Sequence, residues 1–364
     1  MFQPPRCPHR DCPRFTAPTH RFYTRQGSYS PKCRAHPVPR FRCRTCGRGF
    51  SRQTFRADYR DHKPHVNAQV VKLLTHGIGF RGAARLVGLS RRCLELKARQ
   101  ISRNARWLDH NLKRRAARFS LGVGEGTMRV HFDEFETFEE RRNTRPVTIA
   151  VAIESRTRFH FAAVAAPIRP RGKMTASRRR AVEEDEARFG PRPTRSRTAC
   201  KVALRRAARV EPRASGVLLY TDKKRSYLPI AKWAFGPRTI AHSRTSSALP
   251  RGRRNPLFPI NNEEAELREK LSRLRRESWL VTKRRKFLNL HLALYSAWRN
   301  WVRPRTNQDK RSPGMILGYA PRRLRHEEVV AWRQDWGLRS PCPFVDGQRA
   351  VGEAACGWAG GAGG

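Results

Sequence analysis

The chain has 364 residues, of which 78 are Lys or Arg and 29 are Asp or Glu, so its formal net charge at pH 7 is +49. A charge of this size exceeds what solubility requires and attracts polyanions, which makes nucleic acid the expected partner. No apolar run reaches the length of a membrane span, and the first residues lack the apolar core of a signal peptide. We therefore expect a cytoplasmic protein that is associated with the nucleoid.

Five of the cysteines lie within the first 46 residues of the chain. Cys7 and Cys12 form one short-spaced pair, and Cys43 and Cys46 form a second. Two such pairs are typical of one tetrahedral zinc site, and in a cytoplasmic chain they indicate a metal before a disulfide. We predict a structural zinc ribbon over residues 1–62 with these four ligands. Because the first pair and the gap between the pairs are both long, one ligand could be replaced by Cys33, His9 or His36.

Residues 63–120 have the pattern of a helix-turn-helix followed by a basic helical connector at 104–120. A first helical stripe ends at Gly77, a short helix ends in a tight turn at Gly88, and Ser90 is the expected N-cap of a third helix. The third helix would expose basic side chains, as a recognition helix in a major groove does. The DNA-binding residues that we expect on it are Arg91, Arg92, Lys97, Arg99 and Arg103.

The segment "MRVHFDEFETFEE", residues 128–140, is unusually acidic for so basic a chain. Its first apolar residues alternate with polar ones as in a strand, and the strand would end by delivering Asp133. A second apolar run, "GVLLYTD", delivers Asp222 in the same way. Between them, "PVTIAVAIESRTRFHFAAVAA" predicts a β-hairpin, and a polar, basic insertion follows at 167–196.

A later helix, "NNEEAELREKLSRLRRESW", is expected to carry Glu263 and Glu264 in its first turn. Three carboxylates from two strands and a helix suit phosphodiester cleavage, because two Mg²⁺ ions about 4 Å apart, held by acids, assist both the attacking and the leaving oxygen. The surrounding arginines would then hold the DNA. A single acid at a strand end is usually a turn or cap residue, so only the combination indicates a catalytic site.

Taken together, the cysteine pairs, the helix-turn-helix, "HFDEFETF", "YTDKKRSY" and the acid-bearing helix resemble bacterial insertion-sequence transposases of the DDE class. The resemblance implies an α/β RNase H-like catalytic domain over 121–304, followed by a C-terminal basic segment and flexible tail over 305–364. It matches Asp133 and Asp222 to the first two catalytic acids. It also implies structural zinc, catalytic Mg or Mn, element ends and target DNA as partners, and a homo-oligomer on DNA. The expected activity is cleavage of DNA strands at the element ends and their transfer to target DNA.

Three glutamates of the helix could supply the third acid: Glu263, Glu264 and Glu266. The stripe of Leu267, Leu271 and Leu274 marks the side of the helix that packs on the sheet, and Glu264 lies beside its N-terminal edge. We therefore predict Glu264. The alternative function, from a different class, is a non-catalytic DNA-binding protein, either a regulator or a decayed transposase copy. A basic RNA-associated protein would fit the charge but would leave the acids unexplained.

Overall fold

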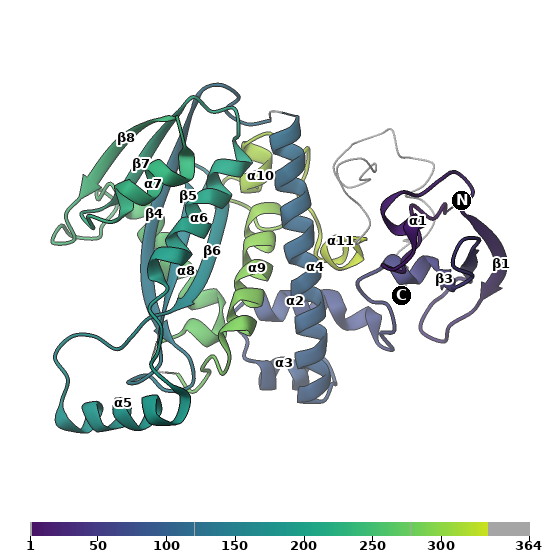
Figure 1. Ribbon diagram of the computed structural model, residues 1–364, viewed down its shortest axis with the longest axis horizontal. Helices are drawn as coiled ribbons and strands as arrows, with labels where there is room; N and C mark the ends of the chain where they lie inside the picture. The colour runs from purple at the N-terminus through teal and green to yellow at the C-terminus, as the bar shows by residue number, and fades with distance from the viewer. Residues whose placement is uncertain (1, 120, 277, 334–364) are drawn as a thin grey trace. The chain divides into compact units, whose positions relative to one another are not determined.

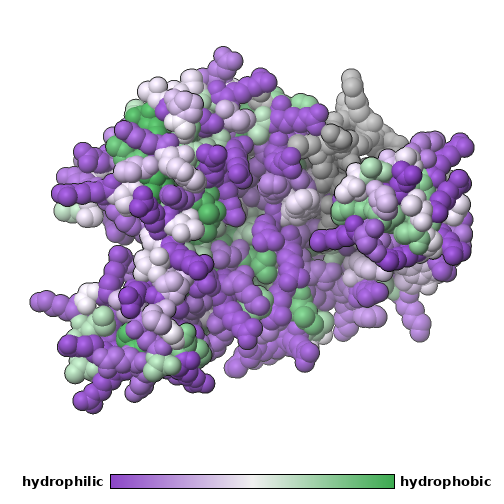
Figure 2. Space-filling view, viewed as in Figure 1, coloured by the Kyte–Doolittle hydropathy of each residue, from purple (hydrophilic) through white to green (hydrophobic). Residues whose placement is uncertain are grey.

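The computed structural model describes residues 2–119, 121–276 and 278–333. Within these ranges the chain forms two compact units, one of residues 2–68 with 324–333 and the other of residues 69–323 (Figure 1). The tail predicted from "GWAGGAGG" lies outside the described residues. Hydrophilic side chains cover much of the face shown in Figure 2. None of the helices in the described ranges is long and apolar enough to cross a membrane.

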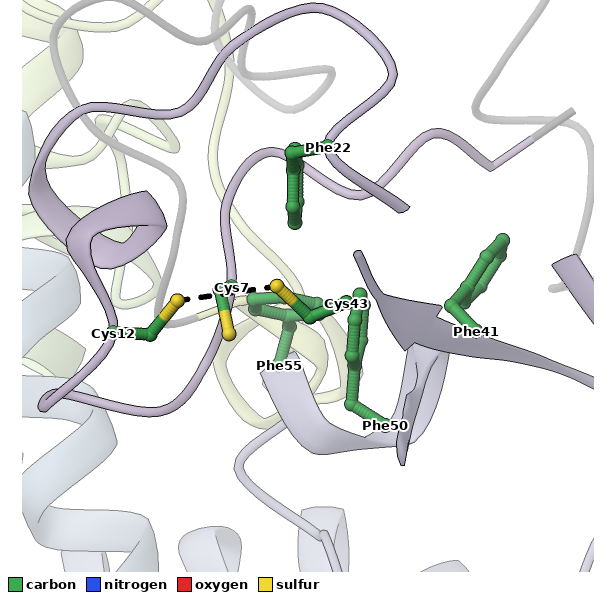
Figure 3. Close-up of a cluster of buried hydrophobic side chains, with 7 residues drawn as sticks. All are labelled: Cys7, Cys12, Phe22, Phe41, Cys43, Phe50 and Phe55. Carbon is green, nitrogen blue, oxygen red and sulfur yellow. Dashed lines mark hydrogen bonds between the residues drawn. The ribbon is translucent and has the colours of Figure 1, made fainter. Parts of the chain in front are cut away.

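The smaller unit is built around an antiparallel three-stranded sheet of order β1-β2-β3. Its strands are β1 (Tyr23–Tyr29), β2 (Val38–Cys43) and β3 (Gly49–Ser51). Its helical turns are α1 (Pro13–Thr16), η1 (Arg52–Phe55), η2 (Pro64–Val66) and α11 (His326–Ala331). Its main core cluster is aromatic, with Phe22, Phe41, Phe50 and Phe55 packed beside buried cysteines (Figure 3). A core this small leaves a large role for any bound metal in stabilising the unit.

Three helices follow: α2 (Asn67–Thr75), α3 (Phe80–Leu86) and α4 (Arg91–Arg118). The predicted turn and cap are present, since Gly88 has φ +64° and the Ser90 Oγ accepts a hydrogen bond from the Cys93 N–H at 3.2 Å. The predicted connector is not separate, because it continues the third helix into one helix of 28 residues. No Gly or Pro interrupts it, and its buried stripe persists from Leu94 to Ala116.

The larger unit contains a mixed five-stranded sheet of order β6-β5-β4-β7-β8. The strands are β4 (Thr127–Phe138), β5 (Pro146–Glu154), β6 (His160–Pro167), β7 (Gly216–Asp222) and β8 (Thr239–Thr245). β4, β5 and β6 pair antiparallel, whereas β4, β7 and β8 pair parallel. The predicted hairpin is therefore present as β5 and β6, and the fold of this unit is α/β.

Side chains of β4 alternate between two layers of helices. Phe132 packs against Tyr227 of α7, with ring centroids 4.9 Å apart, whereas His131 on the other face bonds to the carbonyl of Pro256, just before α8. The remaining helical elements are α5 (Ala176–Phe189), α6 (Ser196–Val210), α7 (Tyr227–Phe235), α8 (Phe258–Lys270), η3 (Ser272–Leu274), α9 (Arg285–Trp301) and α10 (Pro313–Ile316). α5 lies within the predicted insertion. α4 runs alongside α9 (Figure 1).

Three predicted boundaries are wrong. β4 does not end at Asp133 but continues to Phe138, because its pairing with β5 extends to Phe138 and Pro146. Helix α8 begins at Phe258, so its two adjacent glutamates lie in the second turn instead of the first. The helix also ends before Leu271, whose backbone is extended. The leucines predicted to face the sheet are nevertheless all buried.

Candidate active site and metal centre

Four cysteines of the smaller unit come together as predicted. Their sulfur atoms all lie within 4.8 Å of one another. The Sγ atoms of Cys7 and Cys46 are 3.8 Å apart, and those of Cys12 and Cys43 are 3.9 Å apart. A tetrahedral zinc ion with Zn–S bonds of about 2.3 Å requires sulfur–sulfur distances of about 3.8 Å. The geometry therefore fits a metal such as zinc.

Local backbone turns present these thiols. Gly47, with φ +68°, donates its N–H to the carbonyl of Cys43 at 2.9 Å and so closes the turn that follows β2. The Cys12 N–H bonds in the same way to the carbonyl of His9 at 3.1 Å. Figure 3 shows the sulfurs of Cys7, Cys12 and Cys43 converging beside the aromatic core. Four protein ligands would close the coordination shell, which is typical of a structural metal site.

The alternative ligands lie outside this cluster. The group of close sulfur atoms contains no contribution from Cys33, His9 or His36. The Cys33 Sγ instead lies 3.7 Å from the carbonyl oxygen of Asp61. The wide spacing of the first cysteine pair therefore does not require a substitute ligand.

In the larger unit, the register of two strands brings Asp133 and Asp222 to the same level. The parallel pairing of β4 with β7 runs as far as His131 and Tyr220, whose rings stack with centroids 4.6 Å apart. Each aspartate follows its stacked residue by two positions, so both point to the same face of the sheet. The negative charge of Asp222 raises the pKa of Asp133, as expected for nearby carboxylates. Asp133 and Asp222 lie just beyond the last paired residues of β4 and β7.

Glu264 on α8 is buried within electrostatic range of Asp133. Burial, together with the negative charge of Asp133, raises the pKa of Glu264 to about 8. Its Oε1 atom is buried and has no hydrogen-bond partner among the described residues. Burial also raises the pKa of Asp133 to about 6, with a further contribution from the charge of Asp222, although the Glu134 N–H donates to Asp133 at 2.7 Å. Negative charges thus act on one another among these acids, from Asp133 on Glu264 and from Asp222 on Asp133.

Arginines surround the acid cluster without neutralising it. The charges of Arg251, Arg268 and Arg276 all favour the ionised form of Glu264, and Arg251 acts on Asp133 as well. Their combined effect is smaller than that of burial, since the pKa values of both acids stay raised. Arg251 belongs to the loop before α8 and Arg276 to the segment after it. The sequence patterns did not identify these arginines, whose positive charges act on the candidate acids.

The other two candidate glutamates of α8 are paired with cations. Glu263 is fully buried and accepts hydrogen bonds from the Tyr295 hydroxyl at 2.6 Å, from His160 Nε2 at 2.9 Å and from Arg299 at 3.3 Å. Glu266 pairs with Arg299 at 3.6 Å and also with Arg303. Of the three candidates, Glu264 is the one whose pKa is raised by the charge of Asp133.

His131 and Glu134 are functional-site neighbours that the sequence did not reveal. The His131 ring bonds to Ser155 Oγ and to the carbonyl of Pro256, each at 2.8 Å, and so ties β4 to the residues that precede α8. Burial lowers the pKa of His131, which keeps the ring neutral. Glu134 points to the opposite face and accepts hydrogen bonds from Ser196 and Tyr227. The sequence did contain a signal for these residues, namely a polar residue at a strand position whose side chain points into a packed layer.

The structure departs from the predicted recognition helix in the exposure of one residue. Arg91, Arg92 and Arg103 are exposed on α4, and the guanidinium of Arg99 lies over the ring of Phe287 at 4.1 Å. Lys97, however, is only 5% exposed. Its predicted exposure is wrong because Lys97 lies on the buried stripe of α4 beside the inward-facing apolar side chains.

No protein-family model matches the sequence, and a search of curated proteins gives no match. The fold and the sites therefore define the class: an α/β protein with a mixed five-stranded sheet and an N-terminal four-cysteine cluster that could bind a metal such as zinc.

Proposed function

We propose that this chain is a DNA transposase of the DDE class, which binds the ends of its element, cleaves DNA strands there and transfers them to target DNA. The proposal is supported by Asp133 and Asp222, which follow the last paired residues of two neighbouring strands, and by the charge of Asp133, which acts on the buried Glu264. The strand order, with three antiparallel strands followed by two parallel ones, is consistent with the RNase H-like domain that the resemblance implies.

The three acids fit a divalent cation. Carboxylate oxygens are the ligands that Mg²⁺ and Mn²⁺ prefer, and the buried Glu264 Oε1 lacks a partner. An ion held by Asp133, Asp222 and Glu264 would supply positive charge for activating an attacking oxygen and stabilising the leaving oxyanion. The protein's own contribution is orientation, since the bonds of Glu263 to Arg299 and His160 set the rotation of α8 about its axis.

Basic residues outside the acid cluster would bind the DNA. The exposed Arg91, Arg92 and Arg103 of α4 are available for phosphate or base contacts, and Arg251 and Arg276 lie close enough to the acids to act on them electrostatically. The formal charge of +49 supports a polyanionic substrate. Two element ends must be joined in one reaction, so we expect the protein to act as a homo-oligomer on DNA.

A strand-transfer assay tests the proposal. The substrate would carry the DNA that flanks the gene at both ends, and the reaction would contain Mg²⁺ or Mn²⁺. Asp133→Asn, Asp222→Asn and Glu264→Gln should each abolish strand transfer and leave DNA binding intact, because these acids would hold an ion instead of DNA. The matched controls are Glu136→Gln on the same strand and Glu269→Gln on the same helix, whose carboxylates make ion pairs well exposed to solvent.

The outcomes separate the two functions. Full activity of Glu264→Gln would refute its role as the third ligand. A wild-type protein that binds the element ends but shows no metal-dependent strand transfer would establish the alternative, a non-catalytic DNA-binding protein.

A further inference from the structure

Trp279 is the most exposed large hydrophobic side chain among the described residues, with 99% of its surface accessible. It lies on the segment 275–284, which joins η3 to α9. An indole is the largest apolar side chain, and full exposure to water is unfavourable unless the residue has a partner. The other exposed tryptophans in the described part of the chain are half-covered, since Trp107 is 43% exposed and Trp233 is 52% exposed.

The backbone on the C-terminal side of Trp279 is held in place. A Cβ atom added to Gly79 would lie 2.9 Å from the side chain of Leu280, so Leu280 packs directly on the start of α3. The Val281 N–H donates to the carbonyl of Trp279 at 3.0 Å, and the carbonyl of Thr282 accepts from the Glu140 N–H at 2.7 Å. The segment is therefore anchored beside the indole, which points away from these contacts into solvent.

The chain around Trp279 is strongly basic. Five cationic side chains within a few residues of it are exposed: Arg275, Arg276, Lys283, Arg284 and Lys286. A single indole among five cations is unsuited to an apolar protein interface, whereas aromatic rings interleaved with cations are typical of surfaces that bind single-stranded nucleic acid. The charge of Arg276 also acts on Glu264. The segment therefore lies within electrostatic range of the candidate active site.

We propose that Trp279 stacks on an unpaired nucleobase of the DNA strand next to the acid cluster. The proposal rests on the proposed function, because DNA is its ligand. Bases within an intact duplex are already stacked on both faces, so the indole can stack only on a base at an overhang, a nick or a displaced strand. The flanking cations bind the phosphates on either side of that base.

The test measures DNA affinity of the full-length, zinc-loaded protein by fluorescence anisotropy in buffer without Mg²⁺, Mn²⁺ or chelator. Two labelled probes of equal length are compared: a duplex with a single-stranded overhang, and a closed dumbbell duplex with no free end. Trp279→Ala should weaken binding to the overhang probe by about tenfold and leave binding to the dumbbell unchanged. Trp279→Phe should restore most of the loss. Trp233→Ala is the matched control, because the cations of Lys201 and Arg205 already lie over that ring.

Equal affinities of Trp279→Ala and wild-type protein for the overhang probe would overturn the proposal. So would an equal loss on both probes, which would indicate a general electrostatic or folding defect. A shift of Trp279→Ala to a smaller oligomer without DNA would assign the indole to a protein interface and would also overturn it. The assay needs no Mg²⁺, Mn²⁺ or chemistry, so it is independent of the strand-transfer test. A wild-type protein that bound neither probe would instead contradict the proposed function.

Discussion

Glu263 and Glu264 are consecutive residues of α8, yet their carboxylates lie in opposite electrostatic environments. Burial would raise the pKa of Glu263, but the charge of Arg299 and the hydrogen bond from His160 outweigh it and hold the pKa below its usual range. Burial and the charge of Asp133 raise the pKa of Glu264 to about 8. One glutamate therefore anchors the helix, and the other lies within electrostatic range of Asp133.

Glu263→Gln should destabilise the protein strongly. The substitution leaves Arg299 buried without its main counter-charge, which costs roughly 3 kcal/mol or more of unfolding free energy. Glu264→Gln, measured at pH 8 without divalent metal, should be neutral or stabilising, because it removes a buried acid that burial and Asp133 disfavour in its charged form. Urea denaturation of both variants gives the comparison.

Glu269→Gln on the exposed side of α8 is the control for these two variants and should change the unfolding free energy little. Similar losses for Glu263→Gln and Glu264→Gln would contradict the division of roles between the two residues.

His291 should make the protein sensitive to acid. It is buried on α9 and lies 3.0 Å from the carbonyl of Leu74, and burial together with the nearby charge of Arg273 lowers its pKa to about 3. Between pH 6.5 and pH 3 the unfolded chain binds a proton at this ring and the folded chain does not. Stability is therefore complete above about pH 6.5 and falls as the pH is lowered through this window, by at most about 1.4 kcal/mol per pH unit.

The measurement is the unfolding free energy as a function of pH for wild-type protein and His291→Gln, whose amide can still donate to the Leu74 carbonyl. The slope between pH 6.5 and pH 3 should be smaller in the variant. Parallel curves would show that other groups cause the loss of stability in acid.

The four-cysteine cluster should bind one zinc ion per chain, as determined by elemental analysis of purified protein. Cys7→Ser should lower the zinc content and destabilise residues 2–68, because metal binding contributes directly to the folding of such a unit. Cys33→Ser is the matched control, since its thiol lies outside the cluster. A zinc content below half an equivalent in wild-type protein, or equal zinc in Cys7→Ser, would exclude this site.

Affinity for DNA should fall steeply with salt, with a log–log slope that decreases by ~0.9 for each phosphate contact removed. Arg92→Ala and Arg103→Ala on the exposed side of α4 should each reduce this slope. Arg180→Ala, which removes an exposed charge from α5, is the control and should leave the slope unchanged. If all three variants behave alike, binding depends on overall charge and not on α4.

Features determined by short stretches of sequence were predictable. The cysteine pairs, the cap at Ser90, the hairpin of β5 and β6 and the strand leading to Asp222 depend on residues close to one another along the chain. Such patterns report the local turns, caps and alternation directly. The same patterns placed the end of β4 wrongly, because its length depends on pairing with β5.

Only the tertiary structure showed that Glu263 is paired with Arg299 and His160, whereas the charge of Asp133 acts on Glu264. Helical periodicity places these two glutamates about 100° apart, one on each flank of the leucine stripe, so the stripe gave only a weak preference. The rotation of the helix is set by its contacts with His160 and Arg299, which lie far away in the sequence. The burial of Lys97 was decided in the same way, since a charged residue is assigned to the surface until the packing of its helix is known.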